Sequence, residues 1–475
     1  MFKKILIANR GEIAVRVIRA CKELGIQTVA VYSEADESCL HVRLSDEAVC
    51  IGPAPSAASY LQIDAILDAA RKTGAQAIHP GYGFLSEKAE FADACDKAKI
   101  VFIGPSAKAI RKLGDKVTAR ATMHRVGVPI PPGTRKPIRS RENVVRIAKD
   151  IGYPLLIKPS AGGGGKGMQI VSSPHALKEA LELSQSESAA VFGSGDVYLE
   201  KVIEDARHIE IQIMADQHGN VIHLGERECS IQRRHQKLIE ESPSVIVDEE
   251  LRKRMGAAAV AAAKAVGYVG AGTVEFLLDR QKQFYFIEMN TRIQVEHPVT
   301  EWVTGIDLIR MQIRVAAGES LGVRQEDVVF KGHAIECRIN AEDPDDDFSP
   351  SPGLVAGLIL PGGPGVRIDT HLYNGYHVPH HYDSLLAKFI VHAENRELAI
   401  ARMLRVLEEF QLENLKTTVP FLQRILKERT FRHGNYTTGF VEELRAADIR
   451  HRLHDFMHKL SDSFRRLTGG GASTF

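Results

Sequence analysis

A run of glycines lies between two short apolar segments, in the stretch LLIKPSAGGGGKGMQIV at residues 155–171. It is not a Walker A loop, because Gly167 follows Lys166 where that motif requires serine or threonine. It matches the spacing G-x-G-x-x-G, yet a strand-like segment follows where a dinucleotide-binding fold needs a helix. Two interpretations remain, a flexible hairpin whose bare backbone amides close over phosphates, and an ordinary mobile hairpin loop. Lys158, just before the glycines, favours the first.

Apolar patterns along the 475 residues predict a multidomain α/β and α+β protein. Residues 1–115 alternate short apolar runs with helical patterns, which is typical of a parallel sheet with crossover helices. Residues 116–330 mix helices and hairpins around the glycine run and predict a nucleotide-binding domain. Residues 331–445 predict a mainly antiparallel β domain that ends in helices. Residues 446–475 predict an amphipathic helix followed by a flexible end.

Charge and cysteine content exclude several classes of protein. The chain has 61 basic and 60 acidic residues, so no overall field attracts nucleic acid or an anionic membrane. The six cysteines lack the close paired spacing of zinc sites or disulfide frameworks, which favours reduced thiols and a cytoplasmic location. No apolar stretch approaches the roughly 20 residues that a membrane span requires. We therefore expect neither a nucleic-acid nor a membrane partner.

A second feature is a predicted hairpin that carries carboxylates. A tight turn at Gln281 and Lys282 would place Glu275 directly opposite Glu288. Facing carboxylates repel each other unless they lie in full solvent or share a divalent cation, and the apolar neighbours argue against full solvent. Together with Asn290 they offer the oxygen ligands that magnesium prefers. The alternative is an exposed sheet face without a metal.

Polar residues continue beyond this hairpin at every second position of the segment EMNTRIQVE, residues 288–296. If the segment is extended, these side chains all lie on one side. Arg292 could then bind a planar anion through its guanidinium fork, and Glu296 could accept a proton from it. A strand with one solvated face is the alternative.

These motifs resemble the biotin carboxylase family, a branch of the ATP-grasp ligases. The resemblance runs over residues 1–445 and implies an N-terminal pre-ATP-grasp domain, an ATP-grasp domain with a glycine-rich lid at about 132–203, and a C-terminal domain. The motifs that carry it are KILIANRGEIAVRVIRAC, HPGYGFLSE, GDK, IKPSAGGGGKGM, LEKVIEDARHIEIQI, ERECSIQRRHQK, IEMNTRIQVEHPVTE and HYDSL.

The resemblance also implies roles for individual residues. It implies magnesium or manganese ligands at Glu275, Glu288 and Asn290, with two metal ions in the site, and it makes Glu296 the general base. It implies bicarbonate contacts from Lys237, Arg292, Gln294 and Val295, and biotin contacts from Arg338 and Tyr82. Glu296, Arg292, Lys237 and Arg338 would form the catalytic set. The implied ATP-binding residues are Lys116, Lys158, Gly164, Gly165, Glu200, Lys201, Ile203, His208, Gln232, His235, Glu275 and Glu288.

The implied reaction uses ATP and bicarbonate to form carboxyphosphate, which then carboxylates biotin. No Met-Lys-Met attachment sequence occurs in the chain, so we expect biotin on a separate carrier protein that serves a carboxyltransferase subunit. The resemblance further implies a homodimer. It leaves the final acceptor open among acetyl-CoA (for fatty acid biosynthesis), propionyl-CoA, methylcrotonyl-CoA and pyruvate.

Two other functions compete with this interpretation. An ATP-grasp ligase acting on an amine or a purine would share the glycine lid and the acidic residues, but would have no reason to retain RIQVE together with Arg338. A regulatory subunit that only holds nucleotide predicts a broken set of catalytic residues, whereas Lys237, Arg292, Glu296 and Arg338 are all present. The C-terminal amphipathic helix either docks a carrier or carboxyltransferase subunit or packs on its own domain.

Overall fold

A computed structural model describes residues 1–134, 136–138, 143–160 and 167–448. Two predicted features lie outside the described residues. They are the lid glycines Gly164 and Gly165, and the C-terminal amphipathic helix from residue 449 onward. None of the described helices combines the length and apolar character that crossing a membrane requires. All six cysteines are free thiols.

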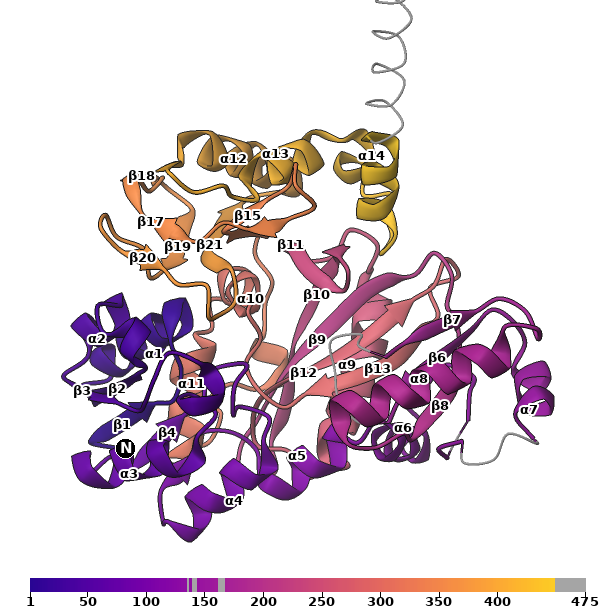
Figure 1. The fold of residues 1–475 in the computed structure, drawn as a ribbon, viewed down its shortest axis with the longest axis horizontal. Coiled ribbons are helices and arrows are strands. Elements are labelled where there is room, and N and C mark those ends of the chain that lie inside the picture. Colours follow the sequence, from indigo (N-terminus) through magenta and orange to yellow (C-terminus); the bar gives the residue numbers. More distant parts are fainter. Residues whose placement is uncertain (135, 139–142, 161–166, 449–475) are drawn as a thin grey trace, which may run out of the picture.

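The N-terminal part forms the parallel sheet that the sequence predicts, with five strands in the order β3-β2-β1-β4-β5 (Figure 1). Both of its faces are covered, because Ile5 and Ile7 of β1 pack into one apolar core while Leu6 and Ala8 pack into another. The strands are β1 (Lys4–Ile7), β2 (Gln27–Tyr32), β3 (Glu47–Cys50), β4 (Ala77–His79) and β5 (Val101–Phe102). The helices are α1 (Gly11–Glu23), α2 (Leu40–Leu44), α3 (Ile63–Thr73), α4 (Ala89–Lys97) and α5 (Ala107–Gly114).

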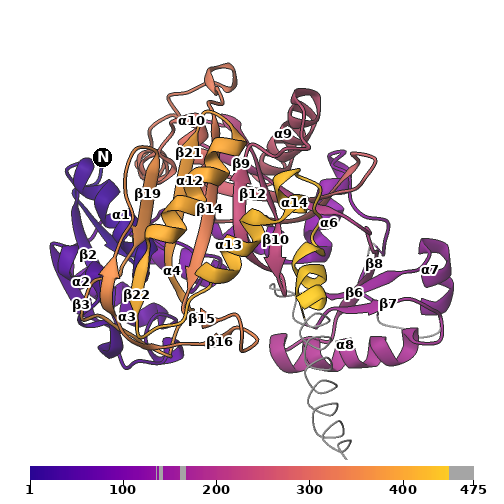
Figure 2. The same ribbon diagram turned by 90° about the horizontal axis from the view of Figure 1, so that it is seen from above.

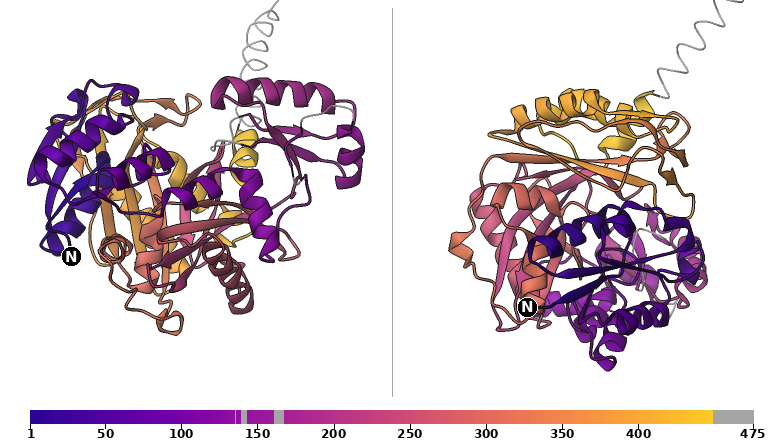
Figure 3. Two further views of the ribbon diagram at one scale, coloured as in Figure 1. Left: turned by 90° about the horizontal axis from the view of Figure 1, so that it is seen from below. Right: turned by 90° about the vertical axis from the view of Figure 1, so that its left-hand side faces the viewer.

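A small unit carries the two strands that flank the glycine run. Its three antiparallel strands have the order β7-β6-β8, and its own apolar core is centred on Leu155 and Ile157. The predicted hairpin of β6 and β7 around the glycines is therefore confirmed. This unit and the five-stranded sheet lie at opposite ends of the molecule (Figures 1 and 3). Its elements are β6 (Leu155–Pro159), β7 (Gln169–Val171), β8 (Val197–Lys201), α7 (Val144–Ile151) and α8 (Leu177–Phe192).

An antiparallel sheet of eight strands forms the centre, in the order β13-β12-β9-β10-β11-β14-β21-β19. Because β11 pairs with β14, the sheet runs continuously across residues 330 and 331, where the sequence suggests a domain boundary. The strands are β9 (Arg207–Ala215), β10 (Val221–Arg233), β11 (Gln236–Ser242), β12 (Gly270–Leu278), β13 (Phe284–Asn290), β14 (His333–Asn340), β19 (Val366–Thr370) and β21 (Leu385–Ala393).

Helices cover parts of this sheet, and α12 lies across β14 and β21 (Figure 2). Three short strand pairs, β15–β16, β17–β20 and β18–β22, complete the C-terminal region. The remaining helices are α6 (Lys116–Arg125), α9 (Glu249–Lys264), α10 (His297–Thr304), α11 (Leu308–Ala316), α12 (Arg396–Glu409), α13 (Val419–Lys427) and α14 (Arg429–Arg432). The short strands are β15 (Glu342–Asp343), β16 (Ser349–Pro350), β17 (Gly353–Leu354), β18 (Ala356–Ile359), β20 (His377–Val378) and β22 (Gln411–Glu413).

The carboxylate hairpin pairs as predicted, but its turn differs. Glu275 lies opposite Glu288, as expected. The loop is one residue longer than a tight turn at Gln281 and Lys282, since Asp279 and Gln283 close it and Lys282 adopts a left-handed φ of 59°. A register shift next to Glu275 compensates for the extra residue and restores the predicted pairing.

The prediction that residues 288–296 are extended is only partly correct, because β13 ends at Asn290. Glu296 is the N-cap residue of α10, and Pro298 occupies the first turn of that helix, where a proline is favourable. Polar side chains after Asn290 therefore reach the site from a loop and a helix start instead of one strand face.

Candidate active site

A pocket of about 590 Å³ opens where the N-terminal sheet meets the central sheet. Its walls come from segments far apart in the chain, namely the start of α1, the loop after β4, the β10–β11 turn, the loop after β13, and β14. The residues predicted for bicarbonate and biotin all line it: Tyr82, Lys237, Arg292, Gln294, Val295 and Arg338.

Glu296, the predicted general base, is completely buried next to this pocket. Lys237 Nζ lies 2.6 Å from its Oε1, and Arg338 Nη2 lies 2.9 Å from its Oε2. Burial alone would raise the pKa of Glu296, but the charges of Lys237, Arg338 and Arg227 hold that pKa well below its usual range. The carboxylate is therefore ionised and able to accept a proton.

Lys237 contacts three carboxylates at once. Its Nζ lies 2.5 Å from Glu210, 3.2 Å from Glu275 and 2.6 Å from Glu296. Burial disfavours the ammonium ion, yet these carboxylates raise the pKa of Lys237 well above its usual value. The lysine is a fixed positive charge that links the predicted metal ligands to the predicted base.

Glu210 is a site residue that the sequence analysis missed. It is fully buried and pairs with both Lys237 and Arg227. Its strand β9 does carry a signal in the sequence RHIEIQI, where Ile209, Ile211 and Ile213 pack into the core. The polar residues between them therefore lie on the opposite face, toward the site.

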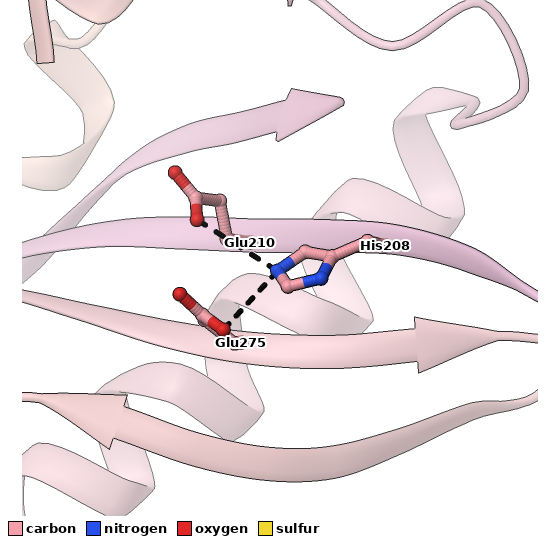
Figure 4. Close-up of side chains that lie close together, drawn as sticks. All are labelled: His208, Glu210 and Glu275. Atoms are coloured by element: carbon pink, nitrogen blue, oxygen red, sulfur yellow. Dashed lines mark ion pairs between the residues drawn. The ribbon is translucent and has the colours of Figure 1, made fainter. Parts of the chain in front are cut away.

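His208 lies on the same face of β9, close to two carboxylates (Figure 4). Its Nε2 lies 3.2 Å from Glu275 and 4.0 Å from Glu210. The three side chains are buried and their ligand atoms lie within 4.8 Å of one another. His208 is thus placed next to a predicted metal ligand.

The residues predicted to bind magnesium offer a suitable set of donors. Glu275 faces Glu288 across the hairpin, and Asn290 Nδ2 donates to Oε1 of Glu275 at 2.8 Å. Burial would raise the pKa of Glu275, but Lys237 and His208 lower it well below its usual range, so the carboxylate is charged. Two carboxylates and an amide oxygen are hard ligands that fit Mg²⁺ or Mn²⁺.

The two lysines predicted for phosphate binding lie near Glu288 of β13. Lys116 is the first residue of α6, and its Nζ lies 3.6 Å from Glu288. Lys158 of β6 is buried, and its Nζ lies 3.0 Å from Glu200. Burial lowers the pKa of Lys116, and the charge of Lys158 lowers it further against the effect of Glu288. Two cations that repel each other form a favourable site for a polyanion such as triphosphate.

In the segment predicted to contact adenine, the Glu200 carboxylate is engaged by protein side chains. Glu200 is buried and pairs with Arg120 as well as Lys158. The backbone N–H of Lys201 donates to the carbonyl of Pro132 at 2.7 Å. Glu200 thus anchors Lys158.

The other two predicted ATP residues lie at the β10–β11 turn. Gln232 is buried and pairs opposite Lys237. His235 is exposed, has a φ of 64°, and lines the pocket that contains Tyr82 and Arg338. His235 therefore shares this pocket with the residues predicted to contact biotin.

Two acids that the sequence analysis missed hold the predicted arginines. Arg292 Nε lies 2.9 Å from Glu87 of the N-terminal region, and its Nη atoms donate to Asn290 and Gln294 at 3.0 Å. Arg338 Nε donates to Glu240 at 2.6 Å. No local pattern marks Glu87 or Glu240, because each meets its arginine only in the folded chain.

Comparison with known proteins gives three domain matches. Residues 1–110 match the biotin carboxylase N-terminal domain, and residues 336–443 match the biotin carboxylase C-terminal domain. Residues 115–324 match the ATP-binding domain of the carbamoyl-phosphate synthase L chain.

Individual relatives agree over nearly the whole chain. A biotin carboxylase from Nostoc is 58% identical over 443 residues, which cover 93% of this chain and 99% of the relative. In Methanothermobacter thermautotrophicus, one of the subunits of pyruvate carboxylase is 56% identical over 94% of this chain and 90% of the relative.

Solved structures share the fold. A biotin carboxylase from Campylobacter jejuni, in complex with β-γ-ATP, has a TM-score of 0.91 and 49% identity, over 93% of this chain and 99% of that one. The biotin carboxylase domain dimer of the Hydrogenobacter thermophilus 2-oxoglutarate carboxylase, in complex with MgADP, ADP and bicarbonate, has a TM-score of 0.90 and 51% identity, over 93% and 98%. The predicted sequence of N-terminal parallel-sheet domain, ATP-grasp domain and antiparallel C-terminal domain is thereby confirmed, and the chain belongs to the biotin carboxylase family of ATP-dependent ligases, which perform the first half-reaction of biotin-dependent carboxylases.

Proposed function

We propose that this chain carboxylates biotin on a separate carrier protein by way of carboxyphosphate, with Glu296 as the base that activates bicarbonate. The observation that carries the proposal is the position of Glu296, an ionised and fully buried carboxylate between Lys237 and Arg338. A base must lie within hydrogen-bond reach of the proton it removes, and this carboxylate borders the pocket that Arg292 and Gln294 line.

Bicarbonate would bind between Lys237 and Arg292. Arg292 is held by Glu87 and can offer its guanidinium to a planar anion. Once bicarbonate attracts the charge of Lys237, less positive charge stabilises the Glu296 carboxylate, and its basicity rises. Glu296 would then take the bicarbonate proton while a bicarbonate oxygen attacks the γ-phosphorus of ATP and ADP leaves.

Lys116 and Lys158 would neutralise the charge that develops on the transferred phosphoryl group. Magnesium or manganese, held by Glu275, Glu288 and Asn290, would supply charge neutralisation at the phosphate oxygens. We propose two such ions. Lys237, which contacts Glu275 as well as Glu296, links this part of the site to the bicarbonate position.

Carboxyphosphate would then break into carbon dioxide and phosphate inside the pocket, a step that requires water to be excluded. The phosphate would remove the ureido proton of biotin, and the nitrogen would attack carbon dioxide. Arg338 would stabilise the negative charge on the ureido oxygen, with Glu240 holding its guanidinium in place. Tyr82 would line the biotin position from the N-terminal side.

We further propose a homodimer that acts with a biotin carboxyl carrier protein and a carboxyltransferase subunit in the cytoplasm. The dimer proposal draws on the Hydrogenobacter thermophilus domain, which is described as a dimer. The free cysteines fit a reducing compartment. One relative is a pyruvate carboxylase subunit, so pyruvate is the acceptor to test first, followed by acetyl-CoA, propionyl-CoA and methylcrotonyl-CoA.

The proposal is tested by measuring ADP formation with ATP, Mg²⁺, bicarbonate and free biotin, and again with bicarbonate or biotin left out. We expect slow bicarbonate-dependent ATP cleavage without biotin and a higher rate when biotin is added. ATP cleavage at a rate that depends on neither bicarbonate nor biotin, or that increases with an amine substrate instead, would refute the proposal. Absence of any ATP cleavage would favour a purely regulatory role.

A further inference from the structure

A buried lysine outside the predicted catalytic set contacts the loop that carries the base. Lys388 lies in the middle of β21, and none of its side chain is exposed. Its Nζ donates to the backbone carbonyl of Val295 at 2.9 Å. That carbonyl belongs to the peptide group joining Val295 to Glu296. A shift of this peptide would therefore displace both the bicarbonate-binding residue and the base.

The same ammonium group reaches the N-terminal domain. Lys388 Nζ lies 3.2 Å from Oε1 of Glu12, the second residue of α1. Oε1 of Glu12 also accepts the hydroxyl hydrogen of Tyr82, which lines the biotin pocket. Tyr82, Glu12, Lys388 and the Val295 carbonyl thus form one continuous chain of polar contacts.

The central sheet fixes the position of Lys388 from its other sides. Lys388 pairs opposite Arg338 on β14 and opposite Asp369 on β19, and its Nζ lies 3.8 Å from Asp369. A buried ammonium ion is costly unless it is paired and hydrogen-bonded. Its position therefore depends on keeping Glu12, Asp369 and the Val295 carbonyl as partners.

We infer that Lys388 and Glu12 are positioning residues that couple the biotin position at Tyr82 to the bicarbonate-binding loop at Val295 and Glu296. The inference rests on the proposed function. It means that a change at the Tyr82 hydroxyl affects bicarbonate binding even when biotin takes no part. By thermodynamic reciprocity, bound biotin and bound bicarbonate would then alter each other's affinity.

The first test replaces Tyr82 with phenylalanine and measures bicarbonate-dependent ATP cleavage without biotin. Tyr82→Phe removes only the hydroxyl at a half-buried position, and the inference predicts an increase of about 2- to 30-fold in the KM for bicarbonate, with the KM for ATP unchanged. Tyr436→Phe is the matched control, since Tyr436 also donates to a buried carboxylate, that of Glu241, but does not line the pocket. An unchanged KM for bicarbonate, or an equal rise in the KM for ATP, would overturn the inference.

The second test is a double-mutant cycle with Lys388→Met. Glu12→Gln is added to the Lys388→Met background so that Glu12 is not left as a buried carboxylate without its cation, while Asp369 keeps its ion pair with Arg367. The inference predicts that Tyr82→Phe has no further effect on the KM for bicarbonate once this chain is broken. Effects that multiply would show that Tyr82 and Lys388 act independently and would contradict it. If the Lys388 variant does not fold, the Tyr82→Phe measurement decides alone.

Failure of the proposed function has a different signature. In that case the unmodified chain itself would show no bicarbonate-dependent ATP cleavage. A failed inference would leave that activity intact and change only its response to the substitutions.

Discussion

Arg338 Nη2 lies 2.9 Å from Oε2 of Glu296, so the predicted biotin-binding cation and the predicted base are in direct contact. Lys237 holds the other oxygen of the same carboxylate at 2.6 Å. Both cations stabilise the ionised form of Glu296 and make it a weak base. Substrates that bind Lys237 and Arg338 would draw these charges away, so the base strengthens when the site fills.

Replacing the base gives the first prediction. Glu296→Gln keeps the size of the side chain but cannot accept the bicarbonate proton, so bicarbonate-dependent ATP cleavage should fall by about 10²- to 10⁴-fold. ATP affinity, measured by equilibrium binding, should remain within a few-fold. Glu409→Gln, on the exposed side of α12, should change neither quantity. Unchanged turnover in Glu296→Gln would remove this residue from its role.

Acidity should affect the biotin step through Glu240. Burial raises the pKa of Glu240 to about 7 despite the opposing charge of Arg338. Below that pH, Glu240 gains a proton, so its contact with Arg338 Nε no longer joins two opposite charges. Glu296 stays ionised, because its pKa is well below its usual range. We therefore expect kcat/KM for biotin to fall as pH drops below about 7, with one proton involved.

The control for this prediction is Glu240→Gln, which has no charge to lose. Its pH profile for biotin should be flat over the same interval. An acid limb that persists in this variant would assign the titration to another group. The effect of pH on the stability of the fold runs in the opposite direction to its effect on the biotin step. Because the pKa of Glu240 is raised in the folded state, this residue contributes stability below pH 4.5, and that stability is lost as the pH rises through 7.

Removing the metal gives the third prediction. Chelation of divalent cations should abolish ATP cleavage, and Mg²⁺ or Mn²⁺ should restore it. Glu288→Gln removes one charged ligand, so the Mg²⁺ concentration for half-maximal activity should rise by at least about tenfold. Glu249→Gln, an exposed glutamate of α9, serves as the control. An unaltered Mg²⁺ requirement in Glu288→Gln would place the ion elsewhere.

Acid sensitivity of the fold should depend on Glu241. Burial alone would raise its pKa, but the hydrogen bond from His333 and the charge of Arg396 lower it to about 2. A depressed pKa contributes stability above pH 4.5 that is lost as pH falls toward 2. Glu241→Gln leaves Arg396 without its carboxylate and should lower the free energy of unfolding by about 3 kcal/mol at pH 7.

Thermal melting at several pH values checks this prediction. The melting temperature of Glu241→Gln should be lower at pH 7 and should depend less on pH between 4.5 and 2. Equal acid sensitivity in the variant and the unmodified chain would contradict the assignment.

Local sequence patterns sufficed for much of the fold. Short apolar runs such as those of β1 and β2, which alternate with helical patterns, predict a parallel sheet, and the two apolar runs around the glycines predict the β6–β7 hairpin. Both predictions rest on local patterns in the sequence. The pairing of Glu275 with Glu288 was predicted with the wrong turn, since the longer loop and the register shift cancel. The end of β13 at Asn290 was not predicted, because the start of α10 decides the path of the following residues.

The partners of the site residues could not be predicted in this way. Glu87 meets Arg292 across 205 positions of sequence, and Glu240 meets Arg338 across 98. The first contact follows from how the N-terminal region packs against the central sheet, and the second from the pairing of β11 with β14 within that sheet. No periodicity of the sequence encodes either arrangement. Glu210 is different, because the alternation of β9 already separates its polar face from its apolar face.

Carboxylation of biotin by this chain is measured by following the carbon of labelled bicarbonate. The chain is incubated with ATP, Mg²⁺ and free biotin, and label is then sought on biotin. We expect acid-labile label on biotin in proportion to the ADP formed, and we expect Glu296→Gln to lose this label. ADP formed at the same rate with no label on biotin would contradict this expectation.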